Sequence, residues 1–299
     1  MFPLGVVRLH PGVWARRLRL LALCGAMIPL AGCGPHYLLL HPAGPVAAIE
    51  LHLMERAALP MGAVILLVWA LCAIVLVRFR DRPGNRAPYT PEWEGSRRLE
   101  ALWFIIPVLI VVFIAVPTVR QTFRLTHLPV RRQPLTIDVV ALDYKWLFEY
   151  PAQRIATVNF LDVPAGTPLL FELTAYAPMD TFWVPQLGGM EFAMPGRVLP
   201  LYLEASTPGT YMGRSANYSG AGYAKMTFAV HALPQAAFGA WVQQVRSSAA
   251  PLTETEYRAL LRQDLTGLAT YAGYPPSTFP AVSDGFTLKG GTYPTAALR

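Results

Sequence analysis

The chain has 299 residues, of which 54% are hydrophobic and only 14% are charged, with a mean hydropathy of +0.36. This composition excludes an intrinsically disordered protein and argues against a wholly soluble enzyme, because about 25% of the residues of a soluble protein are charged. The net charge of +7 comes from residues 1–133, which contain fifteen Arg and six acidic residues, whereas residues 134–299 contain ten basic and twelve acidic ones. Because the basic residues accompany the most hydrophobic segments, they indicate a membrane and not a nucleic acid.

The first 32 residues have the organisation of a secretory signal. Four arginines precede an uncharged run over residues 20–32, which is shorter than the about 20 residues of a spanning helix. The run ends in Leu30-Ala31-Gly32-Cys33, which resembles the cleavage motif of bacterial lipoproteins. We therefore expect a signal peptide over residues 1–32 and a palmitate-type lipid anchor on Cys33. The alternative is an ordinary secretory signal with an incidental cysteine.

Two longer apolar runs follow, over residues 57–77 and 101–119, and neither contains a charge. At a rise of about 1.5 Å per residue, each can cross a hydrocarbon core of about 30 Å. We expect an extracytoplasmic segment over residues 33–56 and transmembrane helices over residues 57–77 and 99–119. The loop over residues 78–98 has six Arg against three acidic residues, and short basic loops face the cytoplasm. The predicted protein spans a bacterial inner membrane twice and places its C-terminal domain in the periplasm.

From residue 134 the sequence changes to short strand-like runs separated by Pro and Gly. Eight such runs lie between residues 136 and 232, and they predict an all-β sandwich or barrel over residues 134–233. One of them, over residues 157–163, is predicted as a single strand. In the remaining part, residues 234–299, helical patterns cover residues 235–245 and 253–263. The last 30 residues are expected to form an extended tail with little core.

The positions of the cysteines and histidines argue against a common type of metal site in the C-terminal domain. The three cysteines are Cys24, Cys33 and Cys72, so the domain beyond residue 134 has no thiolate ligand and no disulfide. The six histidines are scattered, and no two are four residues apart. A conventional zinc or copper site is therefore not expected.

Two motifs in the β-rich part carry a family resemblance. They are Asp143-Tyr-Lys-Trp146 and Tyr218-Ser-Gly-Ala-Gly222. Together with the two preceding helices, they resemble subunit II of the haem–copper respiratory oxidases, and specifically the branch of the cytochrome bo-type ubiquinol oxidases. The resemblance implies a two-helix transmembrane hairpin plus an all-β cupredoxin-like Greek-key sandwich, with short C-terminal helices.

In the copper-containing branch of this family, two loops hold a dinuclear copper centre. The corresponding positions of this chain are Asp180, Ser215, Asn217, Ser219, Tyr223 and Met226. Only Met226 keeps a ligand of that centre, and hydroxyl oxygens do not replace the soft thiolates that bridge copper ions. We therefore expect no metal and no redox centre in this chain. Asp180 and Arg214 are candidates for an ion pair beside this loop.

Glu100 is a candidate functional residue outside the β-rich part, because it lies at the cytoplasmic start of the predicted second span. An ionisable residue at a membrane boundary is a functional candidate by default. In the family that the chain resembles, the glutamate at this position lies beside the mouth of a proton channel in subunit I. Glu100 is therefore a proton-entry candidate, and the alternative is an interfacial carboxylate paired with Arg97 or Arg98.

The resemblance implies a non-redox, structural subunit of a proton-pumping complex that oxidises ubiquinol and reduces oxygen to water. Two haems, one copper ion and the ubiquinol site are then expected in subunit I. Subunit I is the main expected partner, beside subunits III and IV and the lipid bilayer, with neither cytochrome c nor nucleic acid as a partner. The missing thiolates exclude a copper-containing cytochrome c oxidase subunit. The alternative is a membrane-tethered cupredoxin-like binding or scaffold module without an oxidase partner.

Overall fold

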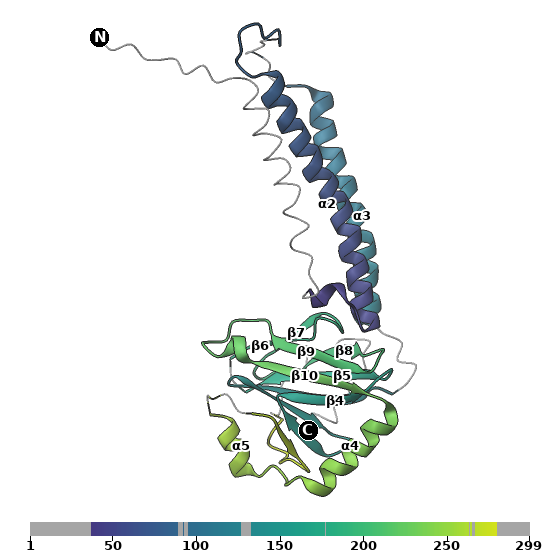
Figure 1. Cartoon of the computed structure of the whole chain (residues 1–299), viewed down its shortest axis with the longest axis vertical. Helices are drawn as coiled ribbons and strands as arrows, with labels where there is room; N and C mark the ends of the chain where they lie inside the picture. The colour runs from purple at the N-terminus through teal and green to yellow at the C-terminus, as the bar shows by residue number, and fades with distance from the viewer. Residues whose placement is uncertain are drawn as a thin grey trace, which may run out of the picture. The chain divides into compact units, whose positions relative to one another are not determined.

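The computed structural model in Figure 1 describes residues 37–88, 92, 95–126, 133–176, 178–262, 264 and 267–279. Residues 1–41 and residues 42–299 are two compact units. The described part of the first unit is a short 3-10 helix, η2 (Leu38–Leu40). Cys33 and the predicted signal peptide lie outside the described residues.

Two long apolar helices begin the second unit, α2 (Pro45–Arg78) and α3 (Arg97–Thr126). Their apolar side chains are exposed: Trp69 and Phe104, for example, are each 75% exposed. Both helices are long and apolar enough to cross a membrane, and none of the most apolar stretch of either is buried within the chain. Exposing this much apolar surface to water is unfavourable by about 25 cal/mol per Å², whereas a lipid core accepts it. Both helices extend beyond the residues predicted to lie in the membrane.

The start of α2 is built into the β-domain. Val46 and Ala47 of its first turn are buried. The backbone N–H of Ala47 donates to the carbonyl of Leu187 at 3.2 Å, and just before the helix the N–H of Ala43 donates to the carbonyl of Gln186 at 2.7 Å. The first turn of the helix is therefore fixed to the β-domain by hydrogen bonds and by apolar packing.

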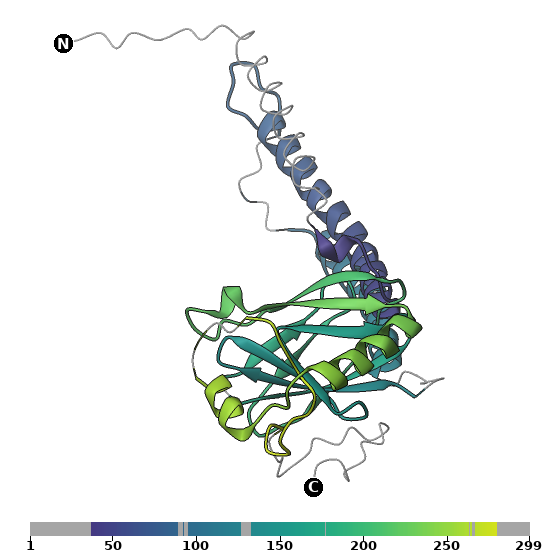
Figure 2. The ribbon, with the colours of Figure 1, turned by 60° about the horizontal axis from the view of Figure 1, so that its bottom comes forward.

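The β-domain consists of two mixed sheets (Figure 2). The six-stranded sheet has the order β11-β3-β2-β1-β5-β8, and the five-stranded sheet has the order β4-β10-β9-β6-β7. The strands are β1 (Leu135–Leu142), β2 (Lys145–Tyr150), β3 (Ile155–Val158), β4 (Phe160–Pro164), β5 (Pro168–Ala175), β6 (Asp180–Trp183), β7 (Met190–Ala193), β8 (Leu199–Glu204), β9 (Gly209–Ser215), β10 (Thr227–Leu233) and β11 (Ala269–Tyr271). The predicted fold class, a helical hairpin followed by a β-sandwich and short helices, is confirmed.

The single strand predicted over residues 157–163 is wrong, because the chain changes sheets within it. β3 belongs to the six-stranded sheet and β4 to the five-stranded one. Between them Asn159 has a φ of 61°, a left-handed conformation that Asn tolerates better than most residues. The side-chain oxygen of Asn159 accepts the backbone N–H of Trp146 at 2.9 Å, so the change of direction is held by a hydrogen bond.

The space between the sheets is filled by aromatic rings. Trp146 and Phe148 on β2 meet Phe182 on β6 and Phe228 on β10, and all four side chains are buried. The Phe182 and Phe228 rings stack at 4.9 Å, and Trp146 meets Phe182 edge-on at 5.5 Å. Because aromatic side chains bury much apolar area in fixed geometries, this cluster fixes how the two sheets lie on each other.

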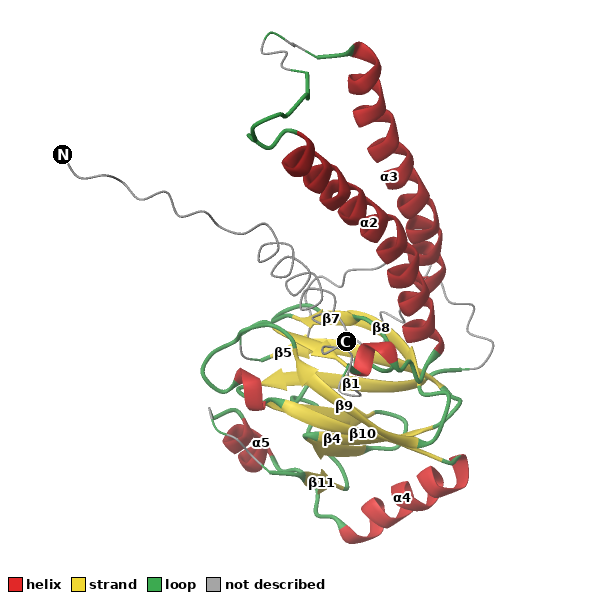
Figure 3. Ribbon diagram, turned by 45° about the horizontal axis from the view of Figure 1, so that its top comes forward, coloured by secondary structure: helices red, strands yellow, loops and turns green. Residues whose placement is uncertain are grey.

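A C-terminal segment covers the outer face of the six-stranded sheet; we call residues 250–279 the C-terminal cap. It follows helix α4 (Gln235–Ser248) and contains α5 (Glu254–Leu260) and β11. Figure 3 shows α5 and β11 beside the strands. A capping box of Thr253 and Glu256 begins α5. The apolar residues that meet in this layer are Val140, Leu142, Leu147, Val158, Leu252, Tyr257, Leu260, Tyr271, Tyr274 and Phe279.

The expectation of a tail without core is therefore wrong as far as residue 279. β11 extends the sheet, and Tyr274 and Phe279 pack on the same apolar cluster. The sequence pattern does not reveal this, because the segment is too short to show a period of its own and is ordered by the sheet beneath it. Residues 280–299 lie outside the described part.

Candidate functional site

Most positions that correspond to copper ligands lie together at one end of the five-stranded sheet. Asp180 begins β6, and Ser215 ends β9. The two strands are antiparallel, with Phe182 opposite Ser215, so the start of β6 meets the end of β9. The loop after β9 then leads through the 3-10 helix η3 (Tyr223–Lys225) to Met226 and β10. Strand pairing therefore brings Asp180 and Ser215, which are 35 positions apart, into one site.

The Asp180 carboxylate is the centre of this site. One of its oxygens, Oδ1, accepts a hydrogen bond from the Ser215 hydroxyl at 2.7 Å and from the Ser219 hydroxyl at 2.8 Å. Asp180 and Ser215 are only 1% and 2% exposed. Burial raises the pKa of Asp180, the two hydroxyls act against this increase, and the nearby charge of Asp143 adds to it. The result is a carboxylate that fixes both serines of the loop.

The other loop positions have different surroundings. The Asn217 amide donates to the carbonyl of Met179 at 3.1 Å, which ties the loop to the segment before β6. The Met226 side chain is 1% exposed and belongs to the core between the sheets. Tyr223 is half-buried and meets Tyr218 edge-on, with ring centroids 5.1 Å apart. The serines and Asp180 therefore converge, whereas Met226 packs in the core and Tyr223 lies against a surface tyrosine.

These residues do not fit a dinuclear copper centre. The donors that converge are two hydroxyls and one carboxylate, which are hard oxygen ligands, and no thiolate or imidazole accompanies them. Across the residues that the structure describes, no group of three or more His, Cys, Asp or Glu side chains could hold a metal ion. In this chain the loop is held by the hydrogen bonds that Ser215 and Ser219 donate to Asp180. In the copper-containing branch of the family that the sequence resembles, bonds to the metal hold the loop.

The predicted ion pair between Asp180 and Arg214 is wrong. Successive residues of a strand point to opposite faces, so Ser215 points toward Asp180 while Arg214 points to the outer face of the sheet. Arg214 is exposed there, opposite Trp183. The two serine hydroxyls occupy the place beside Asp180 for which Arg214 was a candidate.

Tyr144 covers the loop from the other sheet, a contact that the sequence analysis missed. It lies in the two-residue turn between β1 and β2 and has a φ of 63°. A Cβ atom added to Gly220 or Gly222 would overlap the Tyr144 side chain, so the ring lies directly against the backbone of this loop. The two glycines are therefore needed for a close approach between backbone and ring. The pair of glycines in Tyr218-Ser-Gly-Ala-Gly222 is the only sequence signal of this contact.

Comparison with known proteins agrees with this architecture. The chain matches the family models of the cytochrome c oxidase subunit II transmembrane domain over residues 39–120 and of its periplasmic domain over residues 126–233. It is 39% identical over 248 residues to "Quinol oxidase subunit 2" of Bacillus cereus, covering 82% of this chain and 85% of the relative. The chain belongs to the quinol oxidase subunit II family.

Other members of the family are similar over comparable lengths. The chain is 39% identical over 264 residues to the cytochrome bo(3) ubiquinol oxidase subunit 2 of Pseudomonas putida, covering 86% of this chain and 82% of that one. It is 36% identical over 274 residues to the ubiquinol oxidase subunit 2 of Acetobacter aceti, covering 90% and 88%. The predicted family is confirmed, and the protein is membrane-anchored with its β-domain outside the cytoplasm.

Glu100 is an exposed residue in the first turn of α3. Its backbone N–H donates to the carbonyl of Ser96 at 2.9 Å. Among the ion pairs of the described residues, none joins Glu100 to Arg97 or Arg98. The Glu100 carboxylate is therefore exposed at the start of α3, without an ion-pair partner among the described residues.

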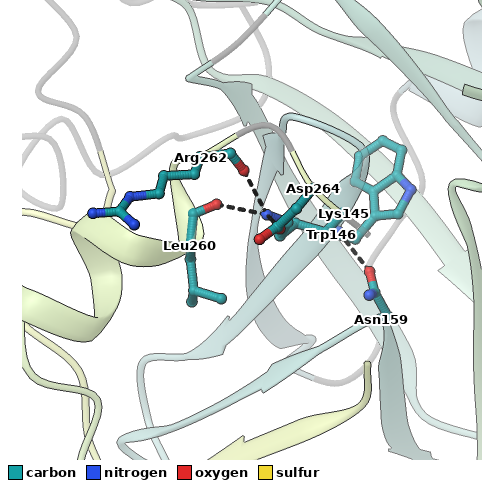
Figure 4. Close-up of polar contacts among 6 residues, drawn as sticks. All are labelled: Lys145, Trp146, Asn159, Leu260, Arg262 and Asp264. Atoms are coloured by element: carbon teal, nitrogen blue, oxygen red, sulfur yellow. Dashed lines mark hydrogen bonds and ion pairs between the residues drawn. The ribbon is translucent and has the colours of Figure 1, made fainter. Parts of the chain in front are cut away.

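Lys145, next to the loop-covering Tyr144, is completely buried and was not singled out by the sequence analysis. Its ammonium group donates to the carbonyl of Leu260 at 2.9 Å, to the carbonyl of Arg262 at 2.8 Å and to the Asp264 carboxylate (Figure 4). Lys145 therefore caps the C-terminal end of α5, where unpaired carbonyls favour a cation. It connects the C-terminal cap to the β1–β2 turn that lies on the loop.

Proposed function

We propose that this chain is the non-redox subunit II of a proton-pumping ubiquinol oxidase, which couples ubiquinol oxidation to the reduction of oxygen to water. Two haems, one copper ion and the ubiquinol site belong to subunit I, which is the main partner. Subunits III and IV complete the complex. This chain contributes two transmembrane helices and an outer domain that is closed by hydrogen bonds and does not accept electrons from cytochrome c.

The observation that carries this proposal is the chemistry of the loop around Asp180. The polar groups of this loop are oxygen atoms that hydrogen-bond to one another: the hydroxyls of Ser215 and Ser219 both donate to the Asp180 carboxylate. Such a site has no capacity to relay single electrons, since that requires a redox-active metal with soft ligands. An oxidase that receives electrons from a quinol within the membrane does not need this relay. The identity to quinol oxidase subunits over most of the chain supports the same conclusion.

Purification from mild detergent tests the proposal. The tagged full-length protein is expected to copurify with a haem-containing subunit and to oxidise ubiquinol with consumption of oxygen, and reduced cytochrome c is expected not to be oxidised. The absence of haem absorbance from the purified material would contradict the proposal and would favour a tethered binding or scaffold module. Copper bound to this chain itself would contradict the non-redox role.

Glu100 is proposed to assist proton entry into subunit I from the cytoplasmic side. An exposed carboxylate at the end of a spanning helix can collect protons from water and deliver them to a channel mouth. Turnover of the complex with Glu100→Ala is expected to fall severalfold while the haem content is unchanged. The matched control is Asp81→Ala, an exposed carboxylate of the predicted cytoplasmic loop over residues 78–98. Wild-type turnover and proton pumping in the Glu100 variant would remove this role.

Cys33 is proposed to carry the lipid anchor of the mature chain, after removal of residues 1–32 as a signal peptide. The motif Leu30-Ala31-Gly32-Cys33 supports this proposal. Intact-mass analysis is expected to show a chain that begins at Cys33 with a diacylglycerol and an added acyl chain. A mature chain with an unmodified Cys33 would contradict it.

A further inference from the structure

Three carboxyl groups form a row on the outer face of the six-stranded sheet. They are Glu149 on β2, Asp138 on β1 and Glu172 on β5; we call them the carboxyl row. Asp138 is the register partner of Glu149 on one side and of Glu172 on the other. Side chains at paired positions of neighbouring strands lie about 4.5–5.5 Å apart at Cβ, so the three groups face one another. Like charges at this spacing repel, and the row is unfavourable if all three are ionised.

The C-terminal cap buries one end of this row. Glu149 is fully buried, and within the described structure neither of its carboxyl oxygens has a hydrogen-bond partner. The Thr278 hydroxyl of the cap lies beside Glu149, but its single hydrogen is donated to the carbonyl of Pro275 at 2.6 Å. A buried carboxyl group that has neither a hydrogen-bond donor nor a cation beside it is favoured in its neutral, protonated form.

Among the described residues, no member of the carboxyl row has an ion pair with Lys, Arg or His. Lys145, on the same strand and face as Glu149, gives its hydrogen bonds to the end of α5. The titratable and charged groups that face the row are Tyr257 and Tyr274 from the cap, Arg154 beside Tyr274, and Tyr202 beside Glu172.

We propose that the C-terminal cap is a proton-dependent latch. It stays closed on the six-stranded sheet while Glu149 is protonated, and it opens when Glu149 releases its proton to water. In the closed state the Glu149 carboxyl group is buried and neutral, and in the open state the ionised carboxylate is hydrated. The ligand of this site is the proton itself, on the side of the membrane where the β-domain lies.

The direction of the pH dependence follows from the burial of Glu149. Burial raises the pKa of Glu149 from 4.5 to about 8, the Thr278 hydroxyl lowers it slightly, and Asp138 raises it further. Burial likewise raises the pKa of Asp138 to about 7, helped by Glu172. Below about pH 4.5 Glu149 is protonated whether the cap is open or closed, so the closed state has its full stability. As the pH rises toward 8 the open state loses its proton first, so the closed state becomes progressively less stable.

Hydrogen–deuterium exchange of the full-length chain in its detergent-solubilised complex tests the latch. Exchange is measured at about pH 6 and about pH 9, and each rate is divided by the chemical rate of an unstructured peptide at that pH. The protection of peptides from residues 250–262 and 267–279 is expected to fall about tenfold to 100-fold between the two values, from the linkage of the Glu149 proton. Peptides of β10, in the other sheet, are the internal reference.

Glu149→Gln is the decisive variant, because glutamine has nearly the same shape and does not ionise. Its cap is expected to remain protected at about pH 9, with only the weaker pH dependence that Asp138 contributes. The matched control is Glu191→Gln on β7 of the other sheet, which is expected to behave as wild type. Equal corrected protection of the wild-type cap at both pH values would overturn the proposal, as would an unchanged pH dependence in Glu149→Gln. If Glu149→Gln does not assemble, the wild-type series alone decides.

Discussion

Replacement of Lys145 with methionine is expected to release the C-terminal cap from the sheet while the rest of the sandwich stays folded. Methionine keeps the length and apolar stem of lysine, so the loss is that of the ammonium group. The carbonyls of Leu260 and Arg262 then lose the donor that they have in the folded state. The Asp264 side chain is 57% exposed and can be hydrated, so the loss of its ion pair with Lys145 adds little to the cost of the substitution. Losing hydrogen bonds from a charged donor to buried carbonyls costs about 2–3 kcal/mol.

Limited proteolysis measures this release. Trypsin cleaves after Arg258, which lies within α5, and cleavage at this site requires the helix to open. A loss of 2–3 kcal/mol corresponds to cleavage that is about 30- to 150-fold faster, if opening is fast compared with cleavage. Lys225→Met, at an exposed lysine of η3, is the control and is expected to leave the rate unchanged. The same slow cleavage in Lys145→Met and wild type would show that Lys145 does not hold the cap.

Gly222→Ala is expected to displace the loop of the functional site. Gly222 has a φ of −90°, so alanine is compatible with its backbone. The added Cβ would overlap ring atoms of Tyr144, and this part of the ring is next to the backbone of the tight β1–β2 turn, so it cannot move away easily. Overpacking of a closely packed contact costs about 1–3 kcal/mol. The loop is expected to move, which weakens the hydrogen bonds of Ser219 and Ser215 to Asp180.

A double-mutant cycle isolates this contact. Denaturant unfolding of the full-length protein in detergent is measured for Gly222→Ala, Tyr144→Ala and the double variant. The cost of Gly222→Ala is expected to fall by about 1 kcal/mol or more when Tyr144 is already alanine. Gly239→Ala in α4, where a Cβ atom has open space, is the control and is expected to be neutral or slightly stabilising. Additive effects of the two substitutions would contradict the overlap.

Local patterns predicted the membrane helices and most of the strands. The two spans follow from runs of apolar residues whose length is set by the bilayer, and this signal needs no knowledge of the fold. The strands that were missed are β7 and β11, which are short, and β3 and β4 were merged because both are apolar across Asn159. The positive φ of Asn159 lets the chain pass from one sheet to the other. The hydrophobic pattern around Asn159 would be the same for one continuous strand as for two strands in different sheets.

The positions of the loop were located from the sequence, but their partners were not. Arg214 was a candidate ion-pair partner of Asp180, whereas in the structure Asp180 accepts hydrogen bonds from Ser215 and Ser219. The alternation of side chains along β9 decides between them, and this depends on the register with β6. Lys145 and Glu149 look in the sequence like ordinary polar positions of a strand. Only the cap, which lies more than a hundred residues later, makes them buried.

The sequence by itself determined the charge asymmetry, the two apolar helices, the β-rich outer domain and the absence of thiolates beyond residue 72. These are properties of composition and local period, which do not depend on distant contacts. The tertiary structure alone decided that Asp180 closes the loop after β9, that Lys145 caps α5, and that Glu149 lies in a buried row of carboxyl groups. The free energy of a buried polar group depends on what surrounds it, and here the surroundings come from strands and helices that are far apart in the chain.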